Sequence, residues 1–318
     1  MSLQMHMENP VIKVTNLTKE YKELRAVDGL SFEVYPGEIH GFLGQNGAGK
    51  STTIRMLLSL IKPSSGSIEI FGKSLETNRS EILSKIGAVI ERPDLYKYLT
   101  AYENLRLFAR LSGLKPDQDQ LMYQLTQVGL EKRAHSKVRT FSQGMKQRLG
   151  LAVALIHNPD LIILDEPTNG LDPQGIADIR NLILKLCKKE GKTILVSSHL
   201  LSEIELIADR MIIIDKGKKV VEGAVKELFD PSKMIVNVEL ENPAEMLTVL
   251  QSSIWAENIT EVTGTGFVLQ IDKNQIPGFS SFIINEGGRL ISLQPKYSLE
   301  DYFLSLTSAN QHVDRFTN

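Results

Sequence analysis

The sequence contains almost no cysteine: a single residue, Cys187, in 318. One cysteine excludes an intrachain disulfide and is typical of proteins kept in a reducing cytosol. Cys187 falls in an apolar row with Leu182, Ile183 and Leu186, which matches one face of a helix. We therefore expect a small buried side chain rather than a reactive thiol.

Long hydrophobic runs and an excess of positive charge are also lacking. No apolar stretch approaches the roughly 18–20 residues that a membrane-spanning helix requires. The first residues lack the basic and apolar pattern of a secretory signal. The net charge of −2 and the pI of about 6.3 do not indicate the excess of basic residues that nucleic-acid binding requires. We expect a cytoplasmic protein without a nucleic-acid partner; if it works at a membrane, another chain must cross that membrane.

The most informative pattern present is the octapeptide Gly44–Ser51, which matches G-x-x-x-x-G-K-[ST]. Its glycines let backbone N–H groups turn inward around an anion, which a Cβ would obstruct. In such a P-loop the lysine reaches the β- and γ-phosphates and the serine hydroxyl ligates Mg²⁺. Residues 38–43 predict a buried strand before the loop, and residues 52–60 a helix whose N-terminus faces the phosphates. The candidate phosphate-binding residues are Gly44, Asn46, Gly47, Gly49, Lys50, Ser51 and Thr52.

The rest of the first 230 residues predicts sheets that alternate with helices. Residues 11–34 alternate apolar and polar side chains, which indicates half-buried strands. Short continuous apolar runs at 161–164, 193–196 and 210–214 are typical of parallel strands covered on both faces. Before these runs, residues from about 95 to 155 turn helical, beginning with a T-x-x-E capping box at Thr100, and further helices lie between the runs. This order indicates a βαβ-type domain with an inserted helical piece.

A second domain is expected to begin after the sequence Asp230-Pro231-Ser232. Its predicted strands are 234–240, 261–263, 266–271 and 289–293, and its predicted helices are 242–251, 275–285 and 298–306. We interpret residues 232–318 as a small α+β domain, with the ferredoxin-like split βαβ as one arrangement.

Two adjacent carboxylates, Asp165 and Glu166, end the apolar run at 161–164. In open α/β folds, ligands bind at the carboxyl ends of the strands. Asp165 would hold Mg²⁺ directly or through a water, and Glu166 would orient or deprotonate the attacking water. The alternative is a strand that simply ends in solvated acids.

A third motif is Phe141-Ser142-Gln143-Gly144-Met145. Ser142 is a natural N-cap, and its hydroxyl with free helix N–H groups would form an anion site. The alternative is an ordinary capped helix with no ligand.

The order of these motifs resembles that of the nucleotide-binding subunits of ABC (ATP-binding cassette) proteins. The family signature L-S-G-G-Q is present in divergent form, with Ser142 and Gly144 kept. Tyr21 resembles the aromatic residue that stacks on adenine. Residues 169–172, ending in Asp172, resemble the D-loop, although Asp172 is also a natural N-cap ahead of a proline. His199 resembles the switch histidine that contacts the γ-phosphate, so the resemblance makes Glu166, His199 and Lys50 the catalytic candidates.

The resemblance implies an α/β fold: a P-loop NTPase (RecA-like) core with an antiparallel β subdomain and a helical insertion at about 92–155. This cassette would span residues 8–231 and use ATP and Mg²⁺. Two cassettes, as a homodimer or a heterodimer, would sandwich two ATP molecules and drive an integral-membrane permease from the cytoplasmic face of the membrane. The permease is expected to dock near residues 91–105, where Tyr96, Tyr98 and Tyr102 are available. Residues 232–318 would serve dimerisation or regulation.

One position departs from the family pattern. The loop after residues 87–90 usually carries a glutamine that touches Mg²⁺, and here Glu91 takes its place. A carboxylate could still hold a water of the Mg²⁺ ion, but it adds negative charge beside phosphates. The stretch 91–105 resembles cassettes of the bacitracin- and lantibiotic-export subgroup.

The leading hypothesis is therefore the ATPase subunit of an ABC exporter that acts on a bacitracin- or lantibiotic-type antibiotic or peptide. Two alternatives are a soluble ABC-type ATPase acting on nucleic acid or the ribosome, and a non-catalytic nucleotide-gated regulator. The single cassette, the absence of heptads and the acidic pI oppose the first alternative. Glu166 and His199 oppose the second.

Overall fold

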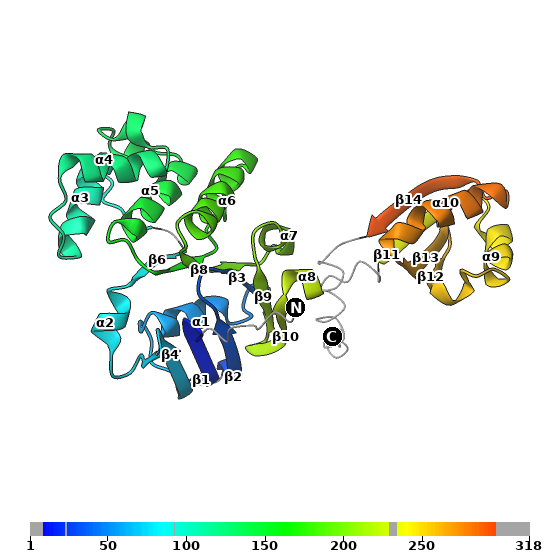
Figure 1. The fold of residues 1–318 in the computed structure, drawn as a ribbon, viewed down its shortest axis with the longest axis horizontal. Helices are drawn as coiled ribbons and strands as arrows, with labels where there is room; N and C mark the ends of the chain where they lie inside the picture. The colour runs from blue at the N-terminus through cyan, green and yellow to red at the C-terminus, as the bar shows by residue number, and fades with distance from the viewer. Residues whose placement is uncertain (1–8, 23, 92, 229–233, 297–318) are drawn as a thin grey trace, which may run out of the picture. The chain divides into compact units, whose positions relative to one another are not determined.

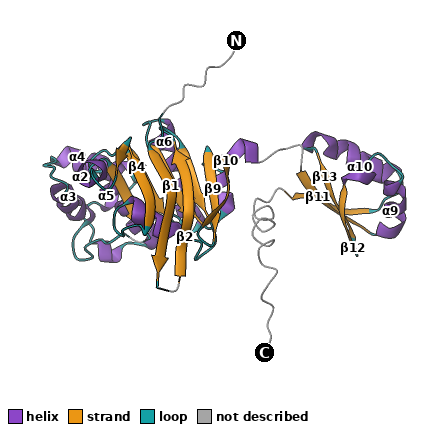
Figure 2. Ribbon diagram, turned by 90° about the horizontal axis from the view of Figure 1, so that it is seen from below, coloured by secondary structure: helices purple, strands orange, loops and turns teal. Residues whose placement is uncertain are grey.

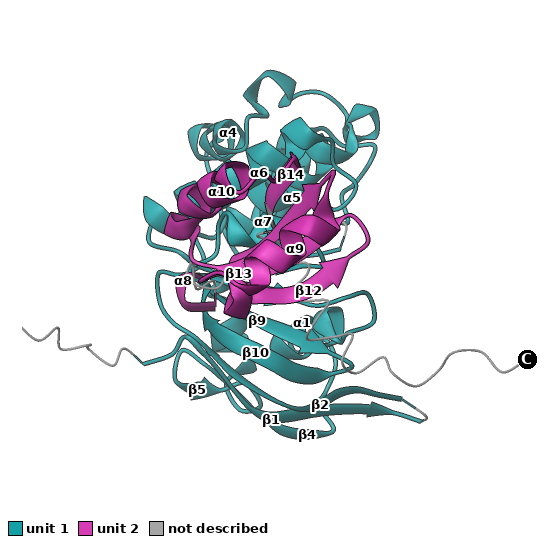
Figure 3. Cartoon of the chain, turned by 90° about the vertical axis from the view of Figure 1, so that its right-hand side faces the viewer, with its two compact units in different colours: residues 1–225 teal, residues 226–318 magenta. Residues whose placement is uncertain are grey.

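The structure, a computed structural model, describes residues 9–22, 24–91, 93–228 and 234–296. The chain divides into two compact units, residues 1–225 and 226–318, which Figure 3 distinguishes by colour. None of the helices in the described ranges combines the length and the apolarity that a membrane crossing demands.

The first unit begins with an antiparallel sheet in the order β2-β1-β4-β5. Its strands are β1 Ile12–Tyr21, β2 Leu24–Val34, β4 Ser65–Ile70 and β5 Lys73–Ser74. Ile12, Val14 and Leu17 of β1 are buried, while the residues between them are exposed. The alternation in the sequence thus produces one core-facing side, as expected for half-buried strands. Figure 2 shows β1, β2 and β4 side by side.

A second sheet, with six strands in the order β10-β9-β3-β8-β7-β6, forms the centre of this unit. Its strands are β3 Ile39–Leu43, β6 Ile86–Ile90, β7 Leu161–Asp165, β8 Thr193–Ser198, β9 Arg210–Asp215 and β10 Lys218–Ala224. All neighbours are parallel except β9 and β10. Every residue of β3, β7 and β8 is buried, which confirms that the continuous apolar runs are central parallel strands.

In the described ranges up to residue 228, eight α-helices connect or extend the strands. They are α1 Lys50–Leu57, α2 Arg79–Leu83, α3 Ala101–Leu111, α4 Gln118–Gln127, α5 Gln143–Leu155, α6 Pro173–Lys188, α7 Leu201–Glu205 and α8 Val225–Leu228. Helices α3, α4 and α5 form the expected helical insertion and lie together, away from the antiparallel sheet (Figure 1). The fold class inferred from the motifs is confirmed.

Helix starts follow the capping residues of the sequence. The Thr100 hydroxyl accepts a hydrogen bond from Glu103 N at 3.1 Å, and the Glu103 carboxylate accepts one from Thr100 N at 2.8 Å. The bond that the Glu103 carboxylate accepts from Thr100 N, together with one from the Thr100 hydroxyl at 2.9 Å, holds the pKa of Glu103 below its ordinary value. The predicted capping box at α3 is therefore confirmed.

The helix after the P-loop is shorter than the sequence predicted. It begins at Lys50 and ends at Leu57, not near residue 60. Ser59 adopts a left-handed conformation with φ of 54°, and the N–H groups of Leu60 and Ile61 turn back to the carbonyl of Arg55. The apolar periodicity continued past the end of the helix because this closing turn also packs against the core.

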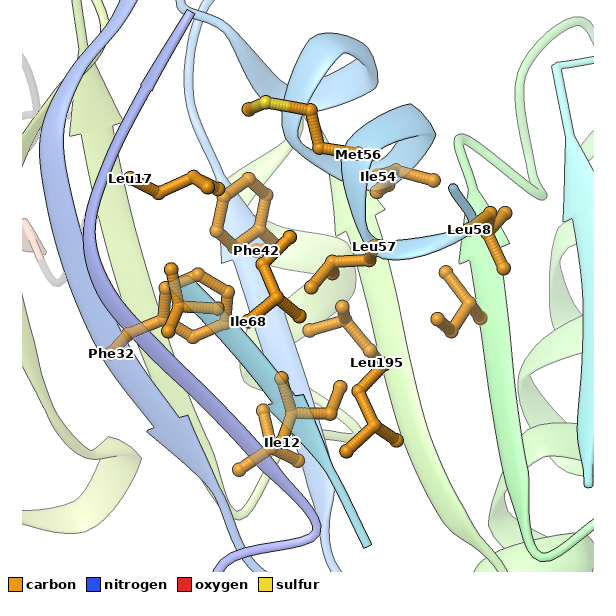
Figure 4. Packing of buried hydrophobic residues seen from close by; sticks show 14 of the residues in the cluster. Ile12, Leu17, Phe32, Phe42, Ile54, Met56, Leu57, Leu58, Ile68 and Leu195 are labelled. Atoms are coloured by element: carbon orange, nitrogen blue, oxygen red, sulfur yellow. The ribbon is translucent and has the colours of Figure 1, made fainter. Parts of the chain in front are cut away.

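Helix α1 is held between the two sheets by an apolar cluster. Phe42 of β3 lies among Phe32 of β2, Leu17 of β1 and Leu57 of α1 (Figure 4). The Phe32 and Phe42 rings are 5.4 Å apart. Full burial of a side chain of this kind contributes about 1.5–3 kcal/mol. The packing therefore fixes the helix that leaves the octapeptide against the strand that enters it.

The second unit has its own core. In chain order it contains β11 Met234–Leu240, α9 Pro243–Gln251, β12 Ile259–Thr263, β13 Gly266–Ile271, α10 Ile276–Asn285 and β14 Leu290–Lys296. The strands form an antiparallel sheet in the order β12-β13-β11-β14, which is a split βαβ connectivity. Trp255 and Phe279 meet edge to face, with ring centroids 5.2 Å apart. The helix expected at 298–306 lies outside the described residues.

Cys187 is buried on α6, as the sequence predicted, and only 3% of its surface is exposed. Burial raises the pKa of its thiol above the ordinary value, so little reactive thiolate forms at neutral pH. We expect the native protein to react with a thiol reagent at least about tenfold more slowly than the unfolded protein. Measuring thiol labelling with and without denaturant checks this, and equal rates would contradict burial.

Candidate functional site

Three neighbouring strands bring the sequence motifs to one edge of the central sheet. Strand β8 lies between β3 and β7, with Leu43 paired to Ser198 and Asp165 paired to Ser197. The strands run in the same direction, so their carboxyl ends meet at one edge. The octapeptide, Glu166 and His199 each follow one of these strands.

The octapeptide is shaped by close backbone packing as well as by its own turns. Gly47 and Gly49 have φ of 85° and 106°, a region that favours glycine. A Cβ on Gly49 would lie 2.6 Å from the carbonyl oxygen of Ala26, and one on Gly44 would lie 2.6 Å from that of Ile214. Gly44 and Gly49 are buried, whereas Asn46 and Gly47 are exposed at the tip. Ser51 and Thr52, in the first turn of α1, are half-buried.

Lys50 is a buried cation in the centre of this site, with 6% of its surface exposed. Its Nζ donates to the carbonyl of Gly44 at 2.7 Å and to that of Gln45 at 3.3 Å. The same Nζ lies 3.2 Å from Glu166 Oε1. A lysine ammonium has three donors, so the fold directs all of them to the P-loop and to the acidic strand end.

Glu166 also faces His199, with Oε2 2.7 Å from His199 Nδ1. Its side chain is 13% exposed and its backbone φ is 50°, which is uncommon for a residue with a Cβ. Backbone strain of this kind concentrates at functional sites. Lys50, Glu166 and His199 therefore form one contiguous charged chain across three strand ends.

Asp165 is completely buried beside the charged chain of Lys50, Glu166 and His199. Its Oδ1 accepts a hydrogen bond of 2.6 Å from the Ser197 hydroxyl, and Ser197 Oγ in turn accepts from Glu166 N at 2.9 Å. Asp165 Oδ2 has no protein partner among the described residues. A buried carboxylate oxygen of this kind normally has a partner, so it fits a hard cation or its water shell.

The signature and D-loop residues cap two helices. The Ser142 hydroxyl accepts from Met145 N at 3.3 Å at the start of α5, and Asp172 Oδ1 accepts from Gly175 N at 3.0 Å at the start of α6. Both predicted N-caps are confirmed. A Cβ on Gly144 would lie 3.8 Å from Leu171, so the two motifs are neighbours. Among the contacts of the described residues, none joins Ser142, Gly144 or Asp172 to Lys50 or Glu166.

Tyr21 and Glu91 also lie outside the charged chain. Tyr21 ends β1, is 48% exposed, and lies under the ammonium of Lys19 at 5.2 Å from its ring centroid. Glu91 has φ of 54°, and its carboxylate pairs with Arg55 of α1 at 2.6 Å. A role for Glu91 at a metal ion would therefore require Arg55 to release it.

Comparison with known proteins identifies the family. A sequence profile of the ABC transporter family matches residues 27–169. The bacitracin transport ATP-binding protein BcrA of Bacillus licheniformis is 42% identical over 93% of this chain and 97% of its own length. The chain belongs to the ATP-binding subunits of ABC transporters. The lantibiotic transport ATP-binding protein SrtF of Streptococcus pyogenes is also 42% identical, over 67% of this chain and 90% of its own.

A solved structure extends the likeness to the fold of this ABC ATP-binding subunit. The cassette MJ0796, in a dimeric post-hydrolysis state with ADP and Pi, is 28% identical to it. The match covers 67% of this chain and 98% of that one, with a TM-score of 0.62. Family and fold together establish the chain as an ATP-binding ATPase subunit.

Ser197 of this ABC subunit was not predicted as a site residue from the sequence motifs. It lies opposite Asp165 in the sheet, although 32 residues separate them in the sequence. A serine at the end of an apolar strand is an ordinary sequence feature. Only the strand pairing could reveal that this hydroxyl orients both acidic residues.

Proposed function

We propose that this subunit powers export of, or resistance to, an antibiotic or peptide of the bacitracin or lantibiotic type. The observation that supports this most directly is the likeness to BcrA, which extends over 93% of the chain and therefore includes most of the second unit. The likeness to SrtF covers 67%. The bacitracin type is therefore the nearer of the two.

In this proposal Glu166 orients the attacking water and accepts its proton, because its carboxylate is placed between a cation and an imidazole. Lys50 would exchange its contacts with Glu166 and the loop carbonyls for phosphate oxygens. His199 would keep its contact with Glu166 Oε2, the oxygen that does not face Lys50, and approach the γ-phosphate. The chemistry is phosphoryl transfer to water, promoted by positioning and by charge neutralisation.

Mg²⁺ would neutralise phosphate charge at this site. The residues suited to hold it are Ser51, through its hydroxyl, and Asp165, through the Oδ2 that lacks a protein partner. No group of three or more His, Cys, Asp or Glu side chains in the described ranges forms a metal cage. Such a site suits an ion that is bound largely through phosphates and water. Glu91 would join it only after leaving Arg55.

Two cassettes, identical or related, would complete each nucleotide site. The helix starts that carry Ser142, Gly144 and Asp172 do not contact the charged chain. These residues are therefore free to serve the nucleotide of a second cassette. The dimeric MJ0796 cassette supports such an arrangement. Tyr21, half exposed at the end of β1, would stack on the adenine.

A separate integral-membrane permease would dock on the cytoplasmic side, near residues 91–105. Asn104 is buried and fixes Tyr96 from both sides, accepting from Tyr96 N at 2.8 Å and donating to Tyr96 O at 3.0 Å. The side chain of Tyr98 is 80% exposed on this loop and that of Tyr96 is 53% exposed, whereas Tyr102 is half-buried near His135. We assign dimerisation or regulation to the second unit.

The proposal predicts antibiotic resistance that depends on hydrolysis. Bacterial cells that express this chain with its permease should tolerate at least about tenfold more bacitracin than cells that carry Glu166→Gln. The minimal inhibitory concentration measures the effect, and Glu190→Gln, at an exposed position, is the matched control. If all strains were equally susceptible to bacitracin, and also equally susceptible to a lantibiotic, the assigned substrate class would be refuted.

A further inference from the structure

Glu203 lies beside the charged chain but is not part of it. It belongs to the first turn of α7 and is half-buried. Its Oε2 accepts a hydrogen bond from the Thr168 hydroxyl at 2.6 Å and another from the Ser198 hydroxyl at 3.3 Å. One oxygen therefore joins two segments that are 30 residues apart in the sequence.

Each of these segments carries a key part of the site. Thr168 follows Glu166 by two residues and directly precedes residues 169–172. The turn between them is closed by Asn169 N to Glu166 O at 3.2 Å and Leu171 N to Thr168 O at 3.2 Å. These two bonds tie residues 169–172 to Thr168 and to the backbone of Glu166.

Ser198 directly precedes His199 and is 1% exposed. Its hydroxyl donates to Glu203 and accepts from Leu200 N at 3.0 Å, so it holds both sides of the histidine. Thr168, Ser198 and Glu203 together line a hollow of about 220 Å³ that is mainly apolar.

From this geometry we infer that Glu203 is a positioning residue that couples residues 169–172 to His199. It holds Ser198, which precedes His199, and Thr168, which follows Glu166. In this way it sets the distance between the side chains of His199 and Glu166. A second cassette that moves residues 169–172 would thereby move the histidine. This inference rests on the proposed roles of Glu166 and His199.

The test compares variants of the purified full chain in ATP hydrolysis. Glu203→Ala should lower kcat by about 10- to 100-fold, because misplacing His199 loosens the reacting geometry. KM for ATP should change less than about twofold, since Lys50 and the P-loop are untouched. Glu203→Gln should keep most of the activity, because its amide oxygen accepts the same two bonds. Glu205→Ala, exposed on the same helix, is the matched control.

Coupling is tested by a double-mutant cycle. Thr168→Val removes one donor and should lower kcat like Glu203→Ala, and the double variant should lose little more. Additive losses, wild-type kcat in Glu203→Ala, or a Glu203→Gln enzyme as slow as Glu203→Ala would each overturn the inference. The thermal midpoint of each variant separates these outcomes from unfolding.

Amide hydrogen exchange provides a readout without turnover. Glu203→Ala should speed exchange at Leu200 and Asn169 relative to Glu205→Ala, and unchanged exchange at both would overturn the inference. A chain that hydrolyses ATP and shows these effects, yet gives no antibiotic resistance with its permease, would refute the proposed substrate class and leave Glu203 its role.

Discussion

Glu166→Gln is expected to lower the turnover of ATP by at least about 100-fold while ATP still binds. The glutamine amide has nearly the same shape as the carboxylate but cannot accept the proton of the attacking water. It also carries no charge opposite Lys50, which lies 3.2 Å from the wild-type carboxylate. The loss should therefore fall on kcat rather than on nucleotide affinity.

Phosphate release from purified protein, with and without Mg²⁺, measures this effect, and nucleotide titration measures binding separately. Glu190→Gln changes the same side chain at an exposed position and should behave like the wild type. Turnover near the wild-type rate in Glu166→Gln would assign the proton acceptor to another residue. Retained ATP should also stabilise the cassette dimer, which gel filtration would detect.

Lys50→Ala is expected to abolish hydrolysis by a different route, through loss of ATP binding. The lysine is a buried cation whose Nζ lies at the octapeptide, where we propose that the phosphates bind. Without it, the Glu166 carboxylate keeps its contact with the His199 imidazole but loses the ammonium group beside it, and the phosphates meet an acidic strand end. We expect affinity for ATP to fall by at least about 100-fold.

Equilibrium binding of a fluorescent ATP analogue distinguishes this variant from Glu166→Gln, which should still bind. Lys62→Ala is the matched control, because Lys62 follows the same helix and its side chain is 84% exposed. The thermal midpoint of Lys50→Ala shows whether the fold persists. Normal affinity in a folded Lys50→Ala protein would remove the lysine from the phosphate site.

The local motifs of this chain could be predicted from the sequence because each depends on residues that are close together in it. The octapeptide carries its own turns, and the caps at Thr100, Ser142 and Asp172 bond to backbone groups three residues away. Continuous apolar runs indicated the central parallel strands, because strands covered on both faces have no polar side.

Contacts between distant segments could not be predicted in this way. The family resemblance suggested a place for Glu91 near a metal ion, but it gave no sign of the pairing with Arg55, 36 residues earlier, that the structure shows. Likewise, apolar periodicity extended the P-loop helix past Leu57, because periodicity does not distinguish the last helical turn from a closing turn that packs on the same core.

The sequence by itself determined the family, the α/β fold, the P-loop and the order of the motifs, since these depend on residue identity and short spacing. Tertiary structure alone decided which atoms meet. It placed Lys50 and His199 on opposite oxygens of Glu166, Ser197 beside Asp165, and Glu203 between Thr168 and Ser198. The reason is that strand order and register bring these residues together, and both are fixed by packing across the whole sheet.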